Sequence, residues 1–156
     1  MSPWLFLLAG CQKLCPEWSR LDGFYAVNPV PDTTDLSGQG IDEFLEGDFF
    51  AMRWSEWELR YQPASREFRI EIDSQPFNAA LTEAADSCSD FGLRMSGVYR
   101  AAGGDERYTF ELAAELFEVG PKWKGEADID LDWTHVDGTG GTVRGLSVYL
   151  LATEPD

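Results

Sequence analysis

Apolar and polar residues alternate one by one from residue 56 to residue 73, with a break at residues 62–66. Alternation with a period of two predicts a β-strand that buries one face and exposes the other. The break contains proline and polar residues, which predicts a turn between two antiparallel strands. The positions expected to face inward are Trp57, Leu59, Tyr61, Phe68, Ile70 and Ile72.

The same alternation continues towards the C-terminus in two further hairpins. One is expected over residues 93–116 with a glycine-rich turn at residues 102–106, and the other over residues 126–153 with a turn at residues 137–141. A first strand is expected at residues 23–27. Seven or eight strands in consecutive hairpins, without β–α–β alternation, predict an all-β fold in which the strands form an antiparallel meander.

Two segments depart from this regular pattern. Residues 78–86 are rich in Ala, Leu and Glu, which predicts two helical turns. In the last strand Leu150 is flanked by Tyr149 and Leu151, so both faces are apolar and we expect the strand to be covered on both sides. Residues 28–40 have no period and are expected to form a long loop with a functional role such as a lid or binding loop.

An apolar run at the N-terminus ends in Leu8-Ala9-Gly10-Cys11. This motif resembles the lipobox of bacterial lipoproteins, although Met1-Ser2-Pro3 lacks the usual basic residue and the apolar run is short. The resemblance implies that residues 1–10 are removed as a signal segment and that Cys11 carries the lipid anchor. Residues 11–22 would then be the lipidated cysteine and its tether, and residues 23–156 a single domain. The alternative is a cytosolic β-protein with a misread N-terminus.

The resemblance also implies that the protein is located in the bacterial cell envelope. Gln12 follows the expected lipidated cysteine, where aspartate marks retention in the inner membrane of some lipoproteins. The outer membrane is therefore favoured over the inner membrane. No other apolar run reaches the roughly 18 residues that a transmembrane helix needs.

The remaining cysteines, Cys15 and Cys88, form an even pair once Cys11 is lipidated. In the oxidising envelope they are expected to form a disulfide, while two unrelated thiols are the alternative.

A short motif at the start of the first expected strand bears on whether the sheet closes into a barrel. Gly23 is followed by aromatic residues at the start of the first strand, which is similar to the first strand of lipocalin-like barrels, with Phe24 in place of the tryptophan of that family. The resemblance favours a closed or partly open lipocalin-like barrel, and a β-sandwich is the alternative. A barrel would also remove the exposed sheet edges.

The chain has a net charge of −16, with the acidic residues spread along its whole length. Such a surface repels phosphate backbones and anionic lipid headgroups, so nucleic acid is excluded as a partner. The expected contact with the membrane is the lipid anchor. The expected second partner is a protein, a small molecule or a glycan.

Few residues offer catalytic chemistry. His135 is the one histidine of the chain, and no nucleophile-elbow, phosphate-loop or dinucleotide motif occurs. The pattern therefore favours a binding or scaffolding protein of the envelope. The alternative is a small envelope enzyme that uses paired carboxylates.

Two sets of residues are candidates for a binding site. Asp128, Asp130 and Asp132 would project from one face of a strand, where they could bridge a calcium ion. The alternative is a solvated face on which Arg144 or Lys124 offsets the repulsion between the three carboxylates. No other cofactor is expected. Trp54 is expected on the charged face of its strand, where an exposed indole could bind a ligand.

Overall fold

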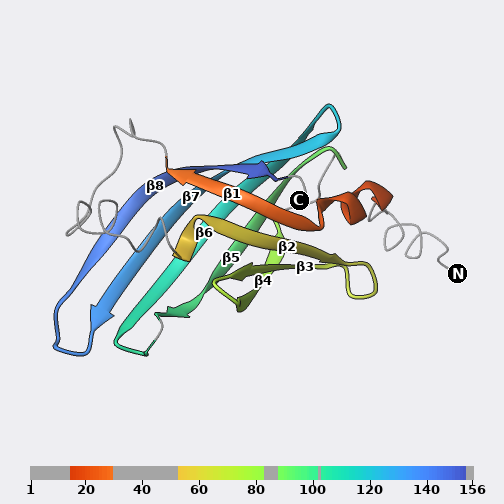
Figure 1. Cartoon of the computed structure of the whole chain (residues 1–156). Coiled ribbons are helices and arrows are strands. Elements are labelled where there is room, and N and C mark those ends of the chain that lie inside the picture. The colour runs from red at the N-terminus through yellow and green to blue at the C-terminus, as the bar shows by residue number, and fades with distance from the viewer. Residues whose placement is uncertain (1–14, 30–52, 83–87, 102, 154–156) are drawn as a thin grey trace, which may run out of the picture.

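The computed structural model describes residues 15–29, 53–82, 88–101 and 103–153. In this part of the chain, eight antiparallel strands follow one another around a closed barrel, as Figure 1 shows. A 3₁₀ helix, η1, precedes them. The elements are η1 (Pro16–Leu21), β1 (Gly23–Pro29), β2 (Glu56–Gln62), β3 (Glu67–Ile72), β4 (Gln75–Leu81), β5 (Asp90–Arg100), β6 (Glu106–Val119), β7 (Lys122–His135) and β8 (Gly140–Ala152).

The predicted antiparallel meander is confirmed, and it closes into a barrel. Strand β1 pairs with β2 on one side and with β8 on the other, so that Tyr25 lies opposite Ala152 and Pro29 opposite Val148. The β2–β3 hairpin has the expected register, with Trp57 opposite Ile72. Closure leaves no free edge between β1 and β8, and this distinguishes the barrel from the sandwich alternative.

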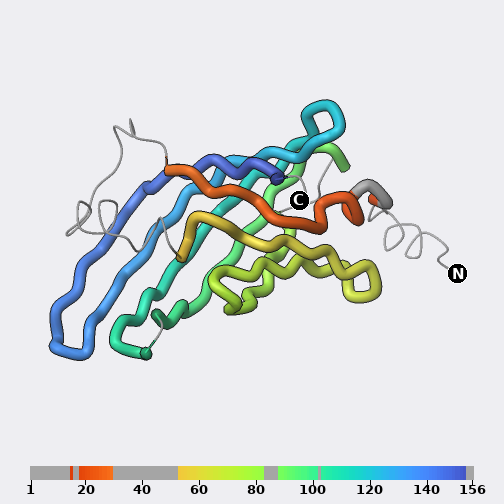
Figure 2. Tube along the Cα trace, viewed as in Figure 1, coloured from red at the N-terminus to blue at the C-terminus, as the bar shows by residue number. Residues whose placement is uncertain are grey.

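The strands differ in length around the barrel. Strands β1 to β4 have 6 or 7 residues, whereas β5 to β8 have 11 to 14. Figure 2 shows that the long strands reach beyond the short ones at one end of the molecule. We call this the distal end, which holds the β3–β4, β5–β6 and β7–β8 turns. The opposite, proximal end holds η1 and the β2–β3 and β6–β7 turns (Figure 1).

Helix η1 belongs to the barrel, although its residues were predicted to be a tether. Trp18 is 4% exposed and Leu21 is fully buried, so the helix packs into the proximal end. The indole of Trp18 contacts the rings of Tyr61, Phe68 and Phe91, with ring centroids 5.4, 5.2 and 4.8 Å away. Residues 18 and 21, within the segment predicted to be a tether, therefore pack against the barrel.

The helical prediction for residues 78–86 is wrong over its described part, because β4 continues to Leu81. Ala79, Ala80 and Leu81 pair with β5 across the sheet, and this pairing overrides the weak helical propensity of Ala and Leu. Residues 83–87 lie outside the described part of the chain, as does most of the predicted loop at residues 28–40; Asn28 and Pro29 belong to β1.

The expectation that the last strand is covered on both sides is also wrong. The outer face of β8 is not covered, since Tyr149 is 51% exposed and Leu151 is 43% exposed. Phe24 points outward and is 47% exposed, whereas the next residue, Tyr25, is buried. The hydroxyl of Tyr25 donates a hydrogen bond to the carbonyl of Leu21 (2.9 Å), which ties β1 to η1.

Candidate functional site

Aromatic side chains pack against one another inside the barrel. Towards the proximal end, Trp18, Tyr61, Phe68, Phe91 and Trp123 form a chain of ring contacts with centroid distances between 4.8 and 5.7 Å. Further along the barrel, Trp54 contacts the rings of Trp57, Tyr99 and Phe110 at 6.3, 5.6 and 5.4 Å. The interior is thus occupied by the protein's own side chains.

The prediction that Trp54 lies exposed on the charged face of its strand is wrong, because its side chain is fully buried. Trp54 precedes β2, which begins at Glu56, so the alternation of the strand does not reach it. The indole inserts among the interior rings of β2, β5 and β6 instead. Trp54 is therefore a core residue and is not an exposed binding residue.

A polar network closes over these rings towards the distal end. The Tyr99 hydroxyl donates a hydrogen bond to the Asp73 carboxylate, and the Arg53 guanidinium lies 3.8 Å from the same carboxylate. Burial, followed by the hydrogen bond to Asp73, raises the pKa of Tyr99 to about 12. Asp73 and Ser74 both have positive φ, 49° and 62°, in the two-residue β3–β4 turn. Such backbone costs about 1–3 kcal/mol per residue, and here it aims the carboxylate at Tyr99.

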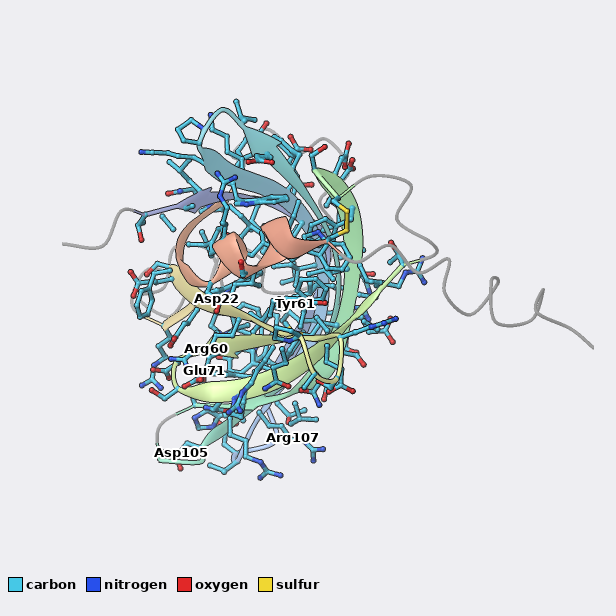
Figure 3. The ribbon with its side chains drawn as sticks, turned by 90° about the vertical axis from the view of Figure 1, so that its right-hand side faces the viewer. Asp22, Arg60, Tyr61, Glu71, Asp105 and Arg107 are labelled. Atoms are coloured by element: carbon cyan, nitrogen blue, oxygen red, sulfur yellow. A yellow bond between two sulfur atoms is a disulfide. The ribbon has the colours of Figure 1, made fainter. Side chains whose placement is uncertain are left out.

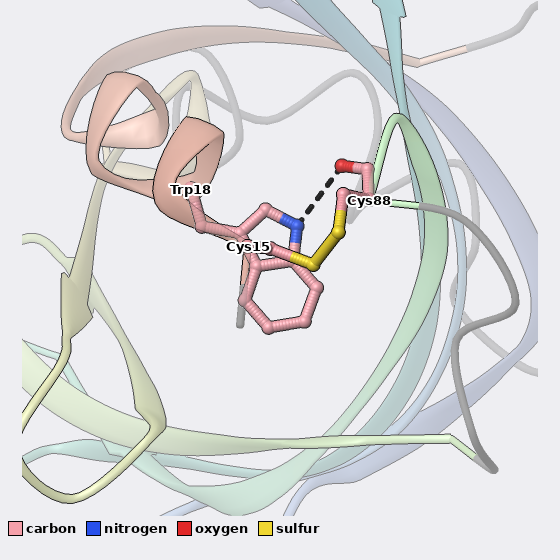
Figure 4. Close-up of a disulfide and its surroundings, with 3 residues drawn as sticks. All are labelled: Cys15, Trp18 and Cys88. Atoms are coloured by element: carbon pink, nitrogen blue, oxygen red, sulfur yellow. Dashed lines mark hydrogen bonds between the residues drawn. A yellow bond between two sulfur atoms is a disulfide. The ribbon is translucent and has the colours of Figure 1, made fainter. Parts of the chain in front are cut away.

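A disulfide between Cys15 and Cys88 holds η1 on the barrel, with a Cα–Cα distance of 5.5 Å. This confirms the predicted pairing. Trp18 strengthens the same junction, because its indole N–H donates a 3.0 Å hydrogen bond to the Cys88 carbonyl (Figure 4). The bridge joins the chain just before η1 to the chain just before β5.

The outer surface of β5 to β8 carries a broad depression. One hollow of about 610 Å³ and a second of about 390 Å³ share Arg94, Ala113 and Asp128, so they form one continuous surface. Ala113 lies directly opposite Arg94 on one side and Asp128 on the other, and its short side chain leaves the floor low. We call this depression the acidic wall, after the carboxylates around it: Glu111, Glu115, Glu126, Asp128 and Asp130.

Carboxylates on the acidic wall lie directly opposite one another. Glu111 faces Asp130 and Glu115 faces Glu126 across β6 and β7. Like charges opposite each other destabilise a sheet. The pKa of Glu115 is raised, first by a hydrogen bond with Asp90 and then by the charges of Asp90 and Glu126. The wall therefore holds unfavourable charge that a positive group could relieve.

The barrel has another opposed pair of acids, Glu58 and Glu71, on β2 and β3. There the charge is offset within the chain, because Arg60 forms an ion pair with Glu58. The hydrogen bond to Glu58 is the first cause of the raised pKa of Arg60, and the nearby charge of Glu71 adds to it. Figure 3 shows Arg60 beside Glu71 on this outer face.

The three aspartates proposed as calcium ligands each have a separate partner on β8. Asp128 accepts a hydrogen bond from the Ser147 hydroxyl (2.7 Å), and Asp130 accepts one from the Gly145 N–H (2.8 Å). Asp132 forms an ion pair with Arg144 (2.8 Å). Across the described ranges, no group of three or more acidic, histidine or cysteine side chains is placed to hold a metal ion. The geometry therefore does not support a bridging cation here.

The carboxylate pairs are exposed, and this bears on the enzyme alternative. A carboxylic acid that stays protonated for general acid catalysis normally needs an apolar or enclosed site. Glu115, Glu126 and Asp90 all lie on the solvent-facing side of their strands. His135 lies beside Asp137 at the β7–β8 turn, 3.2 Å from its carboxylate, and its side chain is 36% exposed. This arrangement resembles a surface ion pair more than a catalytic dyad.

Sequence reasoning singled out Asp128 and Asp130 but missed the other residues that define the acidic wall. Arg94, Ala113 and Asp128 are far apart in the chain and meet only through the registers of β5, β6 and β7. The opposed pairs Glu111–Asp130 and Glu115–Glu126 could have been found by aligning the two predicted strands around the turn at Gly120 and Pro121.

The fold defines a class, the closed eight-stranded antiparallel barrel. Comparisons of the chain with protein-family models, with curated proteins and with solved structures give no match. In the segments that the structure describes, no helix has the length and apolar character needed to cross a bilayer.

Proposed function

We propose that this protein is a lipid-anchored β-barrel of the bacterial cell envelope that binds a partner on its outer wall. One observation carries the proposal: aromatic side chains occupy the interior, while the outer face of β5 to β8 is hollowed and charged. A barrel of eight strands encloses little more than its own side chains or one small ligand. Binding outside the barrel therefore fits this chain better than transport of a ligand inside it.

The envelope address is supported by two features that are independent of each other. Leu8-Ala9-Gly10-Cys11 supplies a lipobox-type sequence. The Cys15–Cys88 disulfide is typical of an oxidising compartment and argues against the cytosolic alternative. The outer membrane remains the favoured destination because Gln12 follows Cys11.

The acidic wall favours a partner with basic side chains. Glu111, Glu115 and Glu126 form no ion pair with any basic residue in the described part of the chain. A lysine- or arginine-rich segment would relieve the repulsion between the opposed acids, and the exposed ring of Tyr149 would add apolar contact. Partner choice would then depend on charge and on salt concentration.

Anchoring is tested by Cys11→Ser. This variant is expected to leave the membrane fraction or to remain unprocessed, because the thioether is the attachment point of the lipid. Detergent-phase partitioning measures the first result, and mass spectrometry of the N-terminus measures the second. Cys88→Ser is the control and should still partition with detergent. A wild-type chain that keeps Met1, together with unchanged partitioning of Cys11→Ser, would contradict the lipoprotein assignment.

Partner binding is tested by neutralising one opposed pair, Glu115→Gln with Glu126→Gln. We expect a labelled oligolysine peptide to bind the wild-type wall and to bind this variant several-fold more weakly, with the difference shrinking at high salt. Removal of the repulsion should also raise the free energy of unfolding by about 0.2–1 kcal/mol.

The matched control is Glu58→Gln with Glu71→Gln, which removes the same charge from an opposed pair on β2 and β3. Oligolysine affinity should fall less in this control than in the wall variant. Equal losses would show that the peptide senses only the net charge and would remove the acidic wall as a specific site.

A further inference from the structure

The lipid anchor and the disulfide are close together in the sequence, and this restricts how the barrel can meet a membrane. Cys11 and Cys15 are four residues apart. A fully extended chain of that length spans at most about 14 Å. Cys15 is in turn bonded to Cys88 at the proximal end of the barrel. A lipidated Cys11 would therefore keep this end within a short reach of the bilayer.

The proximal end is rigidly joined to the rest of the barrel. Asp22 follows η1 and its carboxylate accepts a 2.7 Å hydrogen bond from the N–H of Tyr61, at the end of β2; Figure 3 shows both residues at this end. Arg20 forms a 3.0 Å ion pair with Glu118 beside the β6–β7 turn. Helix η1 is thus bonded to three separate parts of the barrel rim, including Cys88. A short anchor attached to it fixes an orientation as well as a distance.

The lysines gather towards the proximal end. All three lysines of the chain, Lys13, Lys122 and Lys124, lie next to the anchor in sequence or at the start of β7 beside the β6–β7 turn. The β2–β3 and β6–β7 turns, residues 63–66 and 120–121, contain no acidic residue. Each distal turn contains an aspartate: Asp73, Asp105 and Asp137. Acidic residues also lie at the proximal end, among them Asp22, Glu67 and Asp90, so the basic group that could meet anionic headgroups there is the lysine pair beside the β6–β7 turn.

We propose that the proximal end of the barrel rests on the lipid headgroups, with the β6–β7 turn and its lysines against the bilayer surface. This proposal depends on the lipid anchor proposed above. The disulfide is the link that transmits the position of the anchor to the barrel. The distal turns then face away from the membrane, and the acidic wall stands along the side of the barrel where an envelope partner can reach it.

Two exposed valines at opposite ends provide a matched pair of probe sites. Val119 ends β6 and is 47% exposed, whereas Val136 begins the β7–β8 turn and is 72% exposed. Strand β7 lies between them with 14 residues, or about 45 Å along the strand. Each valine is replaced, one at a time, by an encoded residue that carries a fluorophore. The full lipidated protein is then reconstituted in phosphatidylcholine–phosphatidylglycerol vesicles that contain a nitroxide-headgroup lipid.

The fluorophore at Val119 is expected to be quenched several-fold more than the fluorophore at Val136. Equal quenching at the two sites, or stronger quenching at Val136, in protein that floats with the vesicles would overturn the orientation and leave the anchor intact. Protein that does not float with the vesicles would instead contradict the proposed lipid anchor.

A second variant tests the role of the lysines. Lys122→Gln with Lys124→Gln is expected to reduce quenching at Val119 in vesicles with phosphatidylglycerol. In pure phosphatidylcholine the same variant is expected to have no effect on quenching, because those vesicles carry no anionic headgroups. Unchanged quenching in the anionic vesicles would show that the lysines do not contact the headgroups, and would overturn that part of the proposal.

Discussion

At the scale of single residues, Trp54 shows how a side chain can oppose the pattern around it. Its neighbours Arg53, Ser55 and Glu56 are polar or charged, yet its indole is fully buried. The reason is its position just before β2, where the chain enters the barrel and is not bound to the two-residue period of a strand. Three aromatic neighbours then stabilise it from β2, β5 and β6.

Replacing Trp54 with alanine is expected to lower the free energy of unfolding by about 3–5 kcal/mol, because a large buried ring leaves a cavity. Urea denaturation followed by circular dichroism measures the loss. Tyr149→Ala is the control, since that ring is 51% exposed and its removal should change stability by less than about 0.5 kcal/mol. Similar values for the two variants would contradict the core position of Trp54.

At the scale of elements, η1 is too short to be stable alone and depends on what it touches. It has six residues, with proline at its start and no side-chain cap from Cys15. Isolated helices of this length do not form in water. Burial of Trp18 and Leu21, together with the disulfide, supplies the stability that its backbone lacks. The helix is therefore a consequence of the barrel and at the same time closes its proximal end.

Removing the disulfide with Cys15→Ala and Cys88→Ala is expected to cost about 2–5 kcal/mol, because a long loop is then free in the unfolded chain. The bridged residues are 73 apart in sequence. Guanidinium denaturation measures the difference, and reduction of the wild-type protein should reproduce it. Two thiols that react in the native, oxidised protein would contradict the bridge.

At the scale of the whole molecule, the barrel separates an apolar interior from an acidic exterior. The chain has a net charge of −16, and no charged residue is buried in the described part of the chain. A charge of this size destabilises a compact state through self-repulsion and keeps the molecule soluble. The repulsion is greatest where strand registers bring acids together, as at Glu115 and Glu126. Charge and closure together favour binding on the outside.

The sequence alone determined the type of strand and which side of most strands faces inward. Period-two alternation placed Trp57, Leu59, Phe68 and Ile70 correctly, because one buried face is a local property of a strand. The lipobox-type motif and the cysteine count were also local features, and the cysteine count correctly predicted the Cys15–Cys88 bridge.

Tertiary structure alone decided the closure of the barrel, the packing of η1 into its proximal end and the position of the acidic wall. The pairing of β1 with β8 joins the first and the last strand of the barrel, and no local pattern specifies a contact between strands so far apart in sequence. Trp18 and Trp54 lie outside strands, so only the packing around them shows that they are buried. The acidic wall depends on registers that set Arg94, Ala113 and Asp128 side by side across three strands. A single-residue slip would turn these side chains to the other face, which is why the site follows from pairing and not from composition.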